Sequence, residues 1–163
     1  MIGRTMQDAI NEQINKELYS SYLYLSMAAY YESKNLQGFA KWMRMQEAEE
    51  RVHAMKFYDF LVDRGGQVLL KPIAAPENDW KSSLELFRQV AAHEASVTAS
   101  INNLFELAVK EKDYPAQVLL QWFVTEQVEE EKNAAEIVSQ LELVEARGTA
   151  VLMLDHRLGK RGE

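Results

Sequence analysis

Apolar residues recur at alternating spacings of three and four along four long stretches of this chain, as on the core-facing side of a bundle helix. Glycine and proline, which break helices, punctuate the sequence unevenly. No glycine occurs between Gln67 and Arg147, and the three prolines stand at positions 72, 76 and 115. The pattern predicts an all-α fold with helices at roughly 5–31, 36–64, 82–111 and 115–145, followed by a short fifth helix near 149–158.

The connections between these stretches indicate how the helices are arranged. The first and third are short, so each joins two antiparallel neighbours. The second, residues 65–81, can stretch to roughly 55 Å at about 3.3 Å per residue, more than the roughly 45 Å length of a thirty-residue helix. We therefore expect a four-helix bundle with one long crossover between the second and third helices, in a single domain spanning 1–163 whose bundle covers about 5–145.

Local signals mark where several helices begin. Asn35 is a candidate cap of the second helix, Ser82 with Glu85 forms a candidate capping box, and Pro115 suits the first turn of the fourth helix.

Each of the four apolar stripes is interrupted near its middle by polar residues. The stripes consist of Ile10, Ile14, Glu17, Ser21, Tyr24 and Ala28; of Phe39, Met43, Gln46, Glu50, His53, Phe57 and Phe60; of Phe87, Val90, Glu94, Val97, Ile101 and Leu104; and of Leu119, Phe123, Glu126 with Gln127, Glu130, Ala134, Ile137 and Leu141. Midpoints of helices of similar length lie at one height in a bundle. We therefore expect Glu17, Glu50, Glu94, Glu130 and His53 to converge in one buried layer.

Such a layer needs compensation, because an unpaired buried charge costs several kcal/mol and like charges repel one another. Protons, waters or cations could supply it. The chain has no cysteine, which excludes disulfides, thiolate nucleophiles, iron–sulfur clusters and cysteine zinc sites. Carboxylates with one imidazole and no sulfur favour a pair of iron or manganese ions.

Each motif within this pattern, taken alone, is weak evidence for a metal site. The Glu50-x-x-His53 spacing also occurs in ordinary surface pairs, and the run from Glu129 to Glu131 resembles a solvated helix face. His93 and His156 are expected on the surface. The metal interpretation therefore depends on four helices sharing the same interruption at the same height.

Composition narrows the class of protein further. With 163 residues, 47% hydrophobic and 26% charged, the chain suits one globular domain. A net charge of −7 argues against a nucleic-acid partner, which requires a basic surface. No stretch reads as a signal peptide or a membrane span, so we expect a cytoplasmic protein with no membrane partner.

Four segments carry a family resemblance: NKELYSSYLYLSM at 15–27, EERVHAMKF at 49–57, AHE at 92–94 and WFVTEQVEEE at 122–131. With them, the chain resembles the non-haem ferritins of bacteria and archaea over essentially its full length. It differs from bacterioferritin, because Arg51 stands where the haem-ligating methionine would be and Gln127-x-x-Glu130 replaces the second Glu-x-x-His. We therefore expect no haem.

The resemblance implies a set of metal ligands. Glu17, Glu50 and His53 would hold a first iron, and Glu50 would bridge to a second iron held with Glu94 and Glu130. Gln127 would lie beside the oxygen-binding space, and Tyr24 would be a hydrogen-bonding or redox-active neighbour. A third iron site would use Glu49, Glu126 and Glu129, with Glu130 as a candidate shared ligand.

The resemblance also implies the activity and the assembly. It predicts an iron-storage protein with ferroxidase activity, which binds two iron ions per subunit and oxidises Fe(II) with dioxygen or peroxide. The subunits would form a shell of 24 around a ferric mineral. The apolar segment Val151–Leu154 with Leu158 is too short for an independent helix, so it should pack either around fourfold axes or back on its own bundle.

Two other classes of function stay open. One is a di-iron or di-manganese oxidase or peroxidase of small oligomeric state, which keeps its metals through turnover. The other is a structural or metal-buffering bundle that binds iron without accelerating its oxidation.

Overall fold

The computed structural model describes residues 1–144 and 148–162. Its helices are α1 (Arg4–Ser33), α2 (Gln37–Asp63), α3 (Ser83–Lys110), α4 (Tyr114–Val144) and α5 (Gly148–Leu158). The described residues contain no strand, so the predicted all-α fold with a short fifth helix is confirmed. The predicted end of the fourth helix, residue 145, lies outside the described residues.

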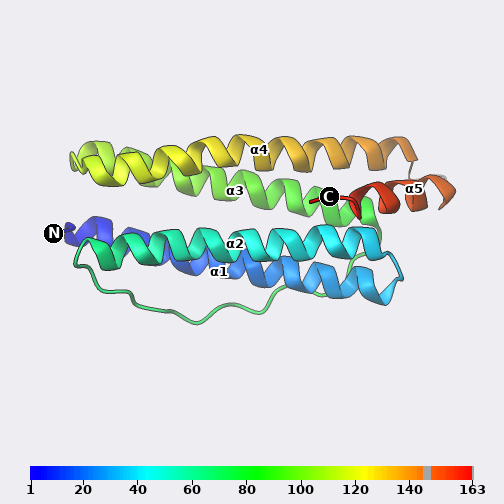
Figure 1. Ribbon diagram of the computed structural model, residues 1–163, viewed down its shortest axis with the longest axis horizontal. Helices are drawn as coiled ribbons and strands as arrows, with labels where there is room; N and C mark the ends of the chain where they lie inside the picture. The colour runs from blue at the N-terminus through cyan, green and yellow to red at the C-terminus, as the bar shows by residue number, and fades with distance from the viewer. Residues whose placement is uncertain (145–147, 163) are drawn as a thin grey trace.

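The four long helices form two antiparallel hairpins, α1 with α2 and α3 with α4, stacked on each other (Figure 1). The segment between α2 and α3 runs along the whole length of the first hairpin, so that α3 runs parallel to α2. The expected long crossover is therefore present. Among the described residues, no helix is both long and apolar enough to cross a membrane.

The crossover lies along α1 because side chains of α1 form hydrogen bonds with the backbone amides and carbonyls of the crossover. Asn11 donates from Nδ2 to the Gln67 carbonyl (2.9 Å) and accepts from the Leu69 amide at Oδ1 (2.7 Å). Near the other end, the Tyr30 hydroxyl donates to the Trp80 carbonyl (2.9 Å). These bonds anchor an extended segment whose backbone has no partners of its own in a helix or sheet.

The starts of α3 and α4 largely follow the sequence signals. The Glu85 amide donates to Ser82 Oγ (3.1 Å), while Glu85 Oε2 accepts from the Lys81 amide (2.7 Å), one residue before the usual capping-box partner. Pro115 is the second residue of α4, where its missing N–H costs nothing, and Asp113 accepts from the Ala116 amide (3.1 Å).

The predicted cap at Asn35 is wrong. Asn35 has a φ of 59° and belongs to the turn that ends α1, and α2 begins after Leu36, which makes no side-chain capping bond. The amide of Phe39 instead donates to Asp155 Oδ1 (2.9 Å), so a side chain of α5 caps α2. Gly38 allows this approach, because a Cβ atom there would lie 1.7 Å from the Asp155 carbonyl oxygen.

Two apolar clusters fill the ends of the bundle, and the polar residues lie between them. One contains Tyr31, Phe39 and Phe87, and the other contains Ile10, Phe57 and Phe123. Two stripe positions were predicted one residue too early: Leu61 and Leu120 are fully buried, whereas Phe60 and Leu119 are only partly buried. Phe60 and Leu119 also pack against the second cluster, so the apolar pattern does not separate them from their buried neighbours.

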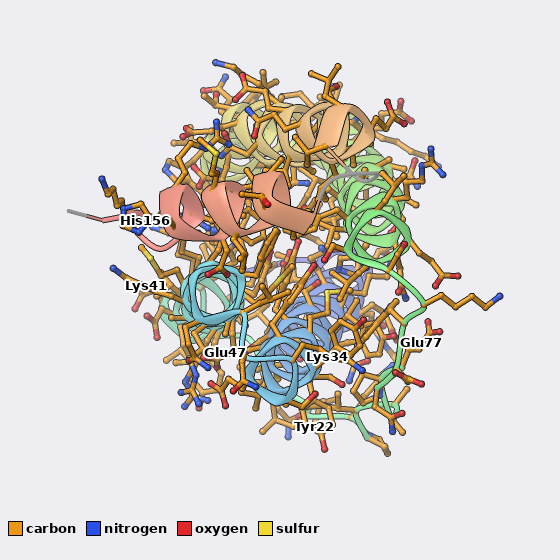
Figure 2. The ribbon with its side chains drawn as sticks, turned by 90° about the vertical axis from the view of Figure 1, so that its right-hand side faces the viewer. Tyr22, Lys34, Lys41, Glu47, Glu77 and His156 are labelled. Carbon is orange, nitrogen blue, oxygen red and sulfur yellow. The ribbon has the colours of Figure 1, made fainter. Side chains whose placement is uncertain are left out.

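Helix α5 lies across one end of the bundle, beside the start of α2 (Figure 2). Its Leu154 and Leu158 are buried in the first apolar cluster, whereas Leu152 and Met153 are 60% and 72% exposed. Leu154 and Leu158 thus pack back on their own bundle, and packing of this helix around fourfold axes stays a prediction.

Candidate metal centre

One ionisable group or pair from each long helix enters the layer between the two apolar clusters. We call Glu17, Glu50, His53, Glu94 and Glu130 the inner group; α1, α3 and α4 give one glutamate each, and α2 gives Glu50 and His53. All five are at most 5% exposed. The expected convergence of these residues in a buried layer is what the structure contains.

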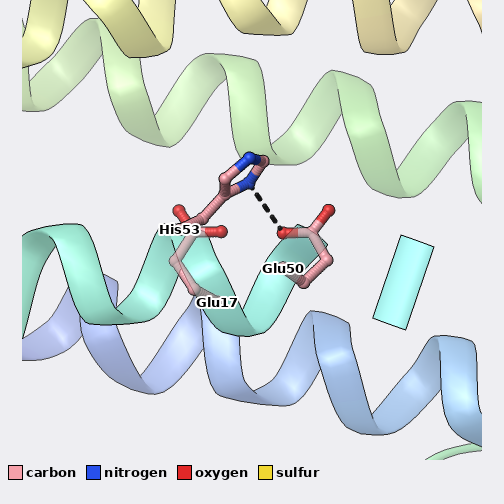
Figure 3. A group of neighbouring side chains, drawn as sticks. All are labelled: Glu17, Glu50 and His53. Atoms are coloured by element: carbon pink, nitrogen blue, oxygen red, sulfur yellow. Dashed lines mark ion pairs between the residues drawn. The ribbon is translucent and has the colours of Figure 1, made fainter. Parts of the chain in front are cut away.

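Three members of the inner group lie closest together (Figure 3). One ligand atom each of Glu17, Glu50 and His53 fall within 4.8 Å of one another. His53 Nδ1 is 3.3 Å from Glu50 Oε2, but this contact lacks hydrogen-bond geometry. Within the described part of the chain, Glu17 Oε2 and Glu50 Oε2 are buried oxygens that no amide, hydroxyl or basic side chain pairs, so only a proton shared between the two carboxyls could join them. Unsatisfied buried acceptors facing an imidazole are suited to a cation.

The other two glutamates are held by neighbouring polar side chains. Glu94 accepts from the Tyr24 hydroxyl at Oε1 and from Gln127 Nε2 at Oε2 (3.2 Å). Glu130 accepts from Gln46 Nε2 at Oε2 (2.9 Å). Tyr24 and Gln127 therefore contact the inner group directly, and the roles that the resemblance implies for them beside the oxidant stay predictions.

Two glutamines that were not assigned to the site also orient its carboxylates. Gln13 donates from Nε2 to Glu17 Oε1 (2.7 Å), and its own Oε1 accepts from the Ser100 hydroxyl (2.7 Å). Ser100 in turn accepts from Lys16 Nζ (2.7 Å). This chain of donors fixes the Gln13 amide with its N–H toward Glu17. Only weak features of the sequence point to these two roles: Gln13 lies one turn before Glu17, and Gln46 belongs to the second apolar stripe.

Burial changes the protonation of the inner group. It raises the pKa of Glu17 and Glu50 well above the usual value, and repulsion from neighbouring carboxylates adds to the effect. Burial, followed by the charge of Glu94, raises the pKa of Glu130 to about 7. Near neutral pH without a metal, the layer therefore retains protons that a bound cation would displace.

We call Glu49, Glu126 and Glu129, the residues expected at a third iron site, the outer group. The side chains of Glu49 and Glu126 are 41% and 28% exposed, and Glu129 is exposed. Glu126 Oε1 lies 3.9 Å from His53 Nε2, on the opposite side of the ring from Glu50. Glu49 pairs with Arg161. Among the described residues, these three glutamates do not gather as closely as Glu17, Glu50 and His53 do.

The expectation for His93 is wrong, whereas His156 is exposed as predicted. His93 is half-buried between α1 and α3, with Nε2 2.8 Å from Ser20 Oγ and its ring edge-on to Tyr24 at 6.3 Å. Its burial lowers the pKa of the imidazole, although Glu94 opposes this. The prediction failed because α3 rotates this position toward α1, which the apolar pattern of α3 alone does not indicate.

Comparison with known proteins agrees with this architecture. Residues 7–144 match a family model described as a ferritin-like domain. A bacterial non-heme ferritin of Bacteroides fragilis (strain 638R) is 40% identical over 161 residues, covering 99% of this chain and 100% of that protein. A bacterial non-heme ferritin of Staphylococcus aureus (strain USA300) is 34% identical over 161 residues, covering 99% and 97% of the two chains.

Solved structures are similar over the same extent. A crystal structure of an open pore ferritin from the archaeon Archaeoglobus fulgidus superimposes with a TM-score of 0.97 at 48% identity and covers 99% of each chain. A humanized archaeal ferritin gives 0.98 at 47% identity and covers 100% of each. The matched model spans most of the sequence, and relatives above 30% identity span nearly all of it. This chain belongs to the ferritin family.

Proposed function

We propose that this protein stores iron by oxidising Fe(II) at the inner group and passing the ferric product to a mineral inside a shell of 24 identical subunits. The observation that carries the proposal is the pair of buried carboxylate oxygens, Glu17 Oε2 and Glu50 Oε2, that no amide, hydroxyl or basic side chain pairs among the described residues. Such oxygens are unfavourable in an empty protein and favourable beside a divalent cation.

The ligand roles follow from this arrangement. Glu17, Glu50 and His53 would bind one Fe(II), and Glu50 would bridge to a second Fe(II) held with Glu94 and Glu130. His53 presents Nδ1 toward Glu50, which leaves the Nε2 side for Glu126 to orient the ring. Tyr24 and Gln127 would keep Glu94 in place, and Gln127 would lie beside the oxidant.

The chemistry requires two electrons to leave together. Each of two Fe(II) ions gives one electron, and dioxygen takes both with two protons to become hydrogen peroxide; if peroxide is the oxidant, it becomes water. The protein supplies position and an anionic environment that favours the more highly charged ferric product. Binding of Fe(II) also releases the protons held by the inner carboxyls, since their raised pKa values fall when a cation replaces the proton.

The outer group would receive iron from the inner group. Glu49, Glu126 and Glu129 are more exposed than the inner carboxylates, so an ion there keeps more of its water and leaves more readily. No haem is part of the proposal. The single-domain organisation and the cytoplasmic location also remain predictions.

One experiment tests the main proposal. Fe(II) is added without oxygen to the purified apo-protein, oxygen is admitted, and ferric absorbance is followed together with particle mass. We expect rapid oxidation and a growing electron-dense core in a particle of roughly half a megadalton, for about 24 subunits of 18.8 kDa. A dimer-sized particle that keeps its metals and forms no mineral would instead support the oxidase or peroxidase alternative. Binding without faster oxidation would support a metal buffer.

A further inference from the structure

The end of the chain lies against α2 and is fixed there at several points. Asp155 caps the start of α2, and Gly38 allows the close contact. Lys41 Nζ donates to the Gly159 carbonyl (2.7 Å). The segment after α5 then runs back from the end of the bundle toward its middle (Figure 1). The position of the tail is therefore set by contacts within its own chain.

This path brings one cation of the tail to the outer group. Arg161 Nη2 donates to Glu49 Oε2 (2.7 Å), and the guanidinium lies 4.9 Å from the centre of the Trp42 ring. The Arg161 side chain is only 22% exposed, and in the described part of the chain its buried Nη1 has no hydrogen-bond partner. Trp42 supports the flat face of the guanidinium, which leaves its edge for the carboxylate.

The geometry points to Arg161 as an internal competitor for Glu49, which holds the outer position in a weakly binding state. The inference rests on the proposed function, because Glu49 is one of the three outer glutamates. A cation that uses Glu49 Oε2 must displace the guanidinium or bind with one ligand fewer. In both cases the positive charge of Arg161 lowers the affinity of the outer group for a divalent ion.

The physical consequence suits a transfer position. An arginine stays charged at every physiological pH, so the competition does not depend on protonation. Once an ion leaves, Arg161 pairs with Glu49 again, which offsets the repulsion among the outer carboxylates. Among the described residues, the inner carboxylates have no comparable arginine or lysine partner; Glu50 lies beside His53, itself a member of the inner group.

The test measures metal affinity and not turnover. The assembled apo-protein is titrated calorimetrically with Zn²⁺ alone, which has no redox chemistry. We expect Arg161→Gln to tighten the weakest class of sites about two- to fivefold, the range of an exposed ion pair. Arg161→Lys keeps the charge but loses the planar group that stacks on Trp42, so its Zn²⁺ affinity should lie between those of the unchanged protein and Arg161→Gln. Arg157→Gln is the matched control, since Arg157 is a basic residue of α5 that pairs with Gln140.

A Glu49→Gln variant separates failure of this inference from failure of the outer position itself. If Glu49→Gln removes a class of Zn²⁺ sites while Arg161→Gln leaves its affinity unchanged, the outer position stands and competition by Arg161 is wrong. If Glu49→Gln changes neither stoichiometry nor affinity, the outer position is wrong and the inference is lost with it. A lower unfolding temperature of Arg161→Gln with unchanged Zn²⁺ affinity would show that Arg161 only anchors the tail.

Discussion

The inner and outer groups are built from the same side chain but place it in opposite environments. Inner carboxylates such as Glu17 and Glu50 are 1% exposed and have raised pKa values. The outer Glu49 is 41% exposed and has an arginine at 2.7 Å. The inner group thus depends on a metal or on protons to offset burial, whereas the outer group is already compensated by water and Arg161. Under the proposed function, this difference suits capture of iron at the inner group and its release at the outer group.

Removing an inner ligand should have the largest effect. Glu50→Ala deletes the carboxylate proposed to bridge both ions, so we expect oxidation of Fe(II) to slow by more than about a hundredfold, beyond the usual effect of changing an outer-shell partner. Stopped-flow absorbance after mixing with oxygen measures this rate. Glu106→Ala, at an exposed position of α3, serves as the control and should oxidise iron at the unchanged rate. Equal rates of Fe(II) oxidation in the two variants would show that the inner group takes no part in the reaction.

The pH dependence of apo-protein stability should come next. Glu130 has a pKa of about 7 in the folded chain against 4.5 for a solvent-exposed glutamate, so between these values only the folded state holds the proton. The free energy of unfolding should therefore fall as pH rises from about 4.5 to about 7, by about 3 kcal/mol for Glu130, and Glu17 and Glu50 act in the same direction. Denaturant unfolding of metal-free protein at several pH values tests this. Glu130→Gln should flatten the slope, and a slope of opposite sign would contradict the burial argument.

A smaller effect is expected from the residue that orients Glu17. Gln13→Leu keeps the volume but removes the donor to Glu17 Oε1, so we expect about a tenfold loss of Zn²⁺ or anaerobic Fe(II) affinity at the inner group. Calorimetry on the apo-protein gives the value. Gln121→Leu, exposed on α4, is the matched control. If both variants bind alike, Glu17 is positioned by packing alone.

The smallest effect on the first turnover should come from the outer group. The double variant Glu126→Ala with Glu129→Ala should leave the initial rate of Fe(II) oxidation within about tenfold of that of the unchanged protein, because most contacts of the inner group remain. Regeneration of the centre before a second addition of Fe(II) should slow more than the first turnover does. Repeated additions monitored by absorbance separate the two rates. If the stoichiometry of oxidation and the rate of regeneration are both unchanged, these residues do not transfer iron.

The sequence predicted the helices and the buried layer well because both depend on local periodicity. Helix bounds agree within two residues wherever the structure describes them, and the four stripes located Glu17, Glu50, Glu94 and Glu130 correctly in depth. Contacts between distant segments were missed. No spacing rule links Asp155 to the start of α2, or Arg161 to Glu49, because each pair is more than a hundred residues apart in the chain.

The same reasoning explains the smaller errors. Asn35 is a good capping residue, but it also tolerates a left-handed conformation, and the turn after α1 used that property. His93 appeared to be a surface residue because its burial comes from a neighbouring helix. Local propensity was outweighed by tertiary packing in both cases.

The division of the bundle into two hairpins has a consequence for how the chain is held together. Glu17, Glu50 and His53 come from the first hairpin, and Glu94 and Glu130 come from the second. A metal pair bridging them would add a cross-link between two halves that the crossover joins covalently and that the two apolar clusters and α5 hold together by packing. After cleavage of the crossover, metal would therefore tighten the association of the two fragments, as a ligand that binds only the associated state does.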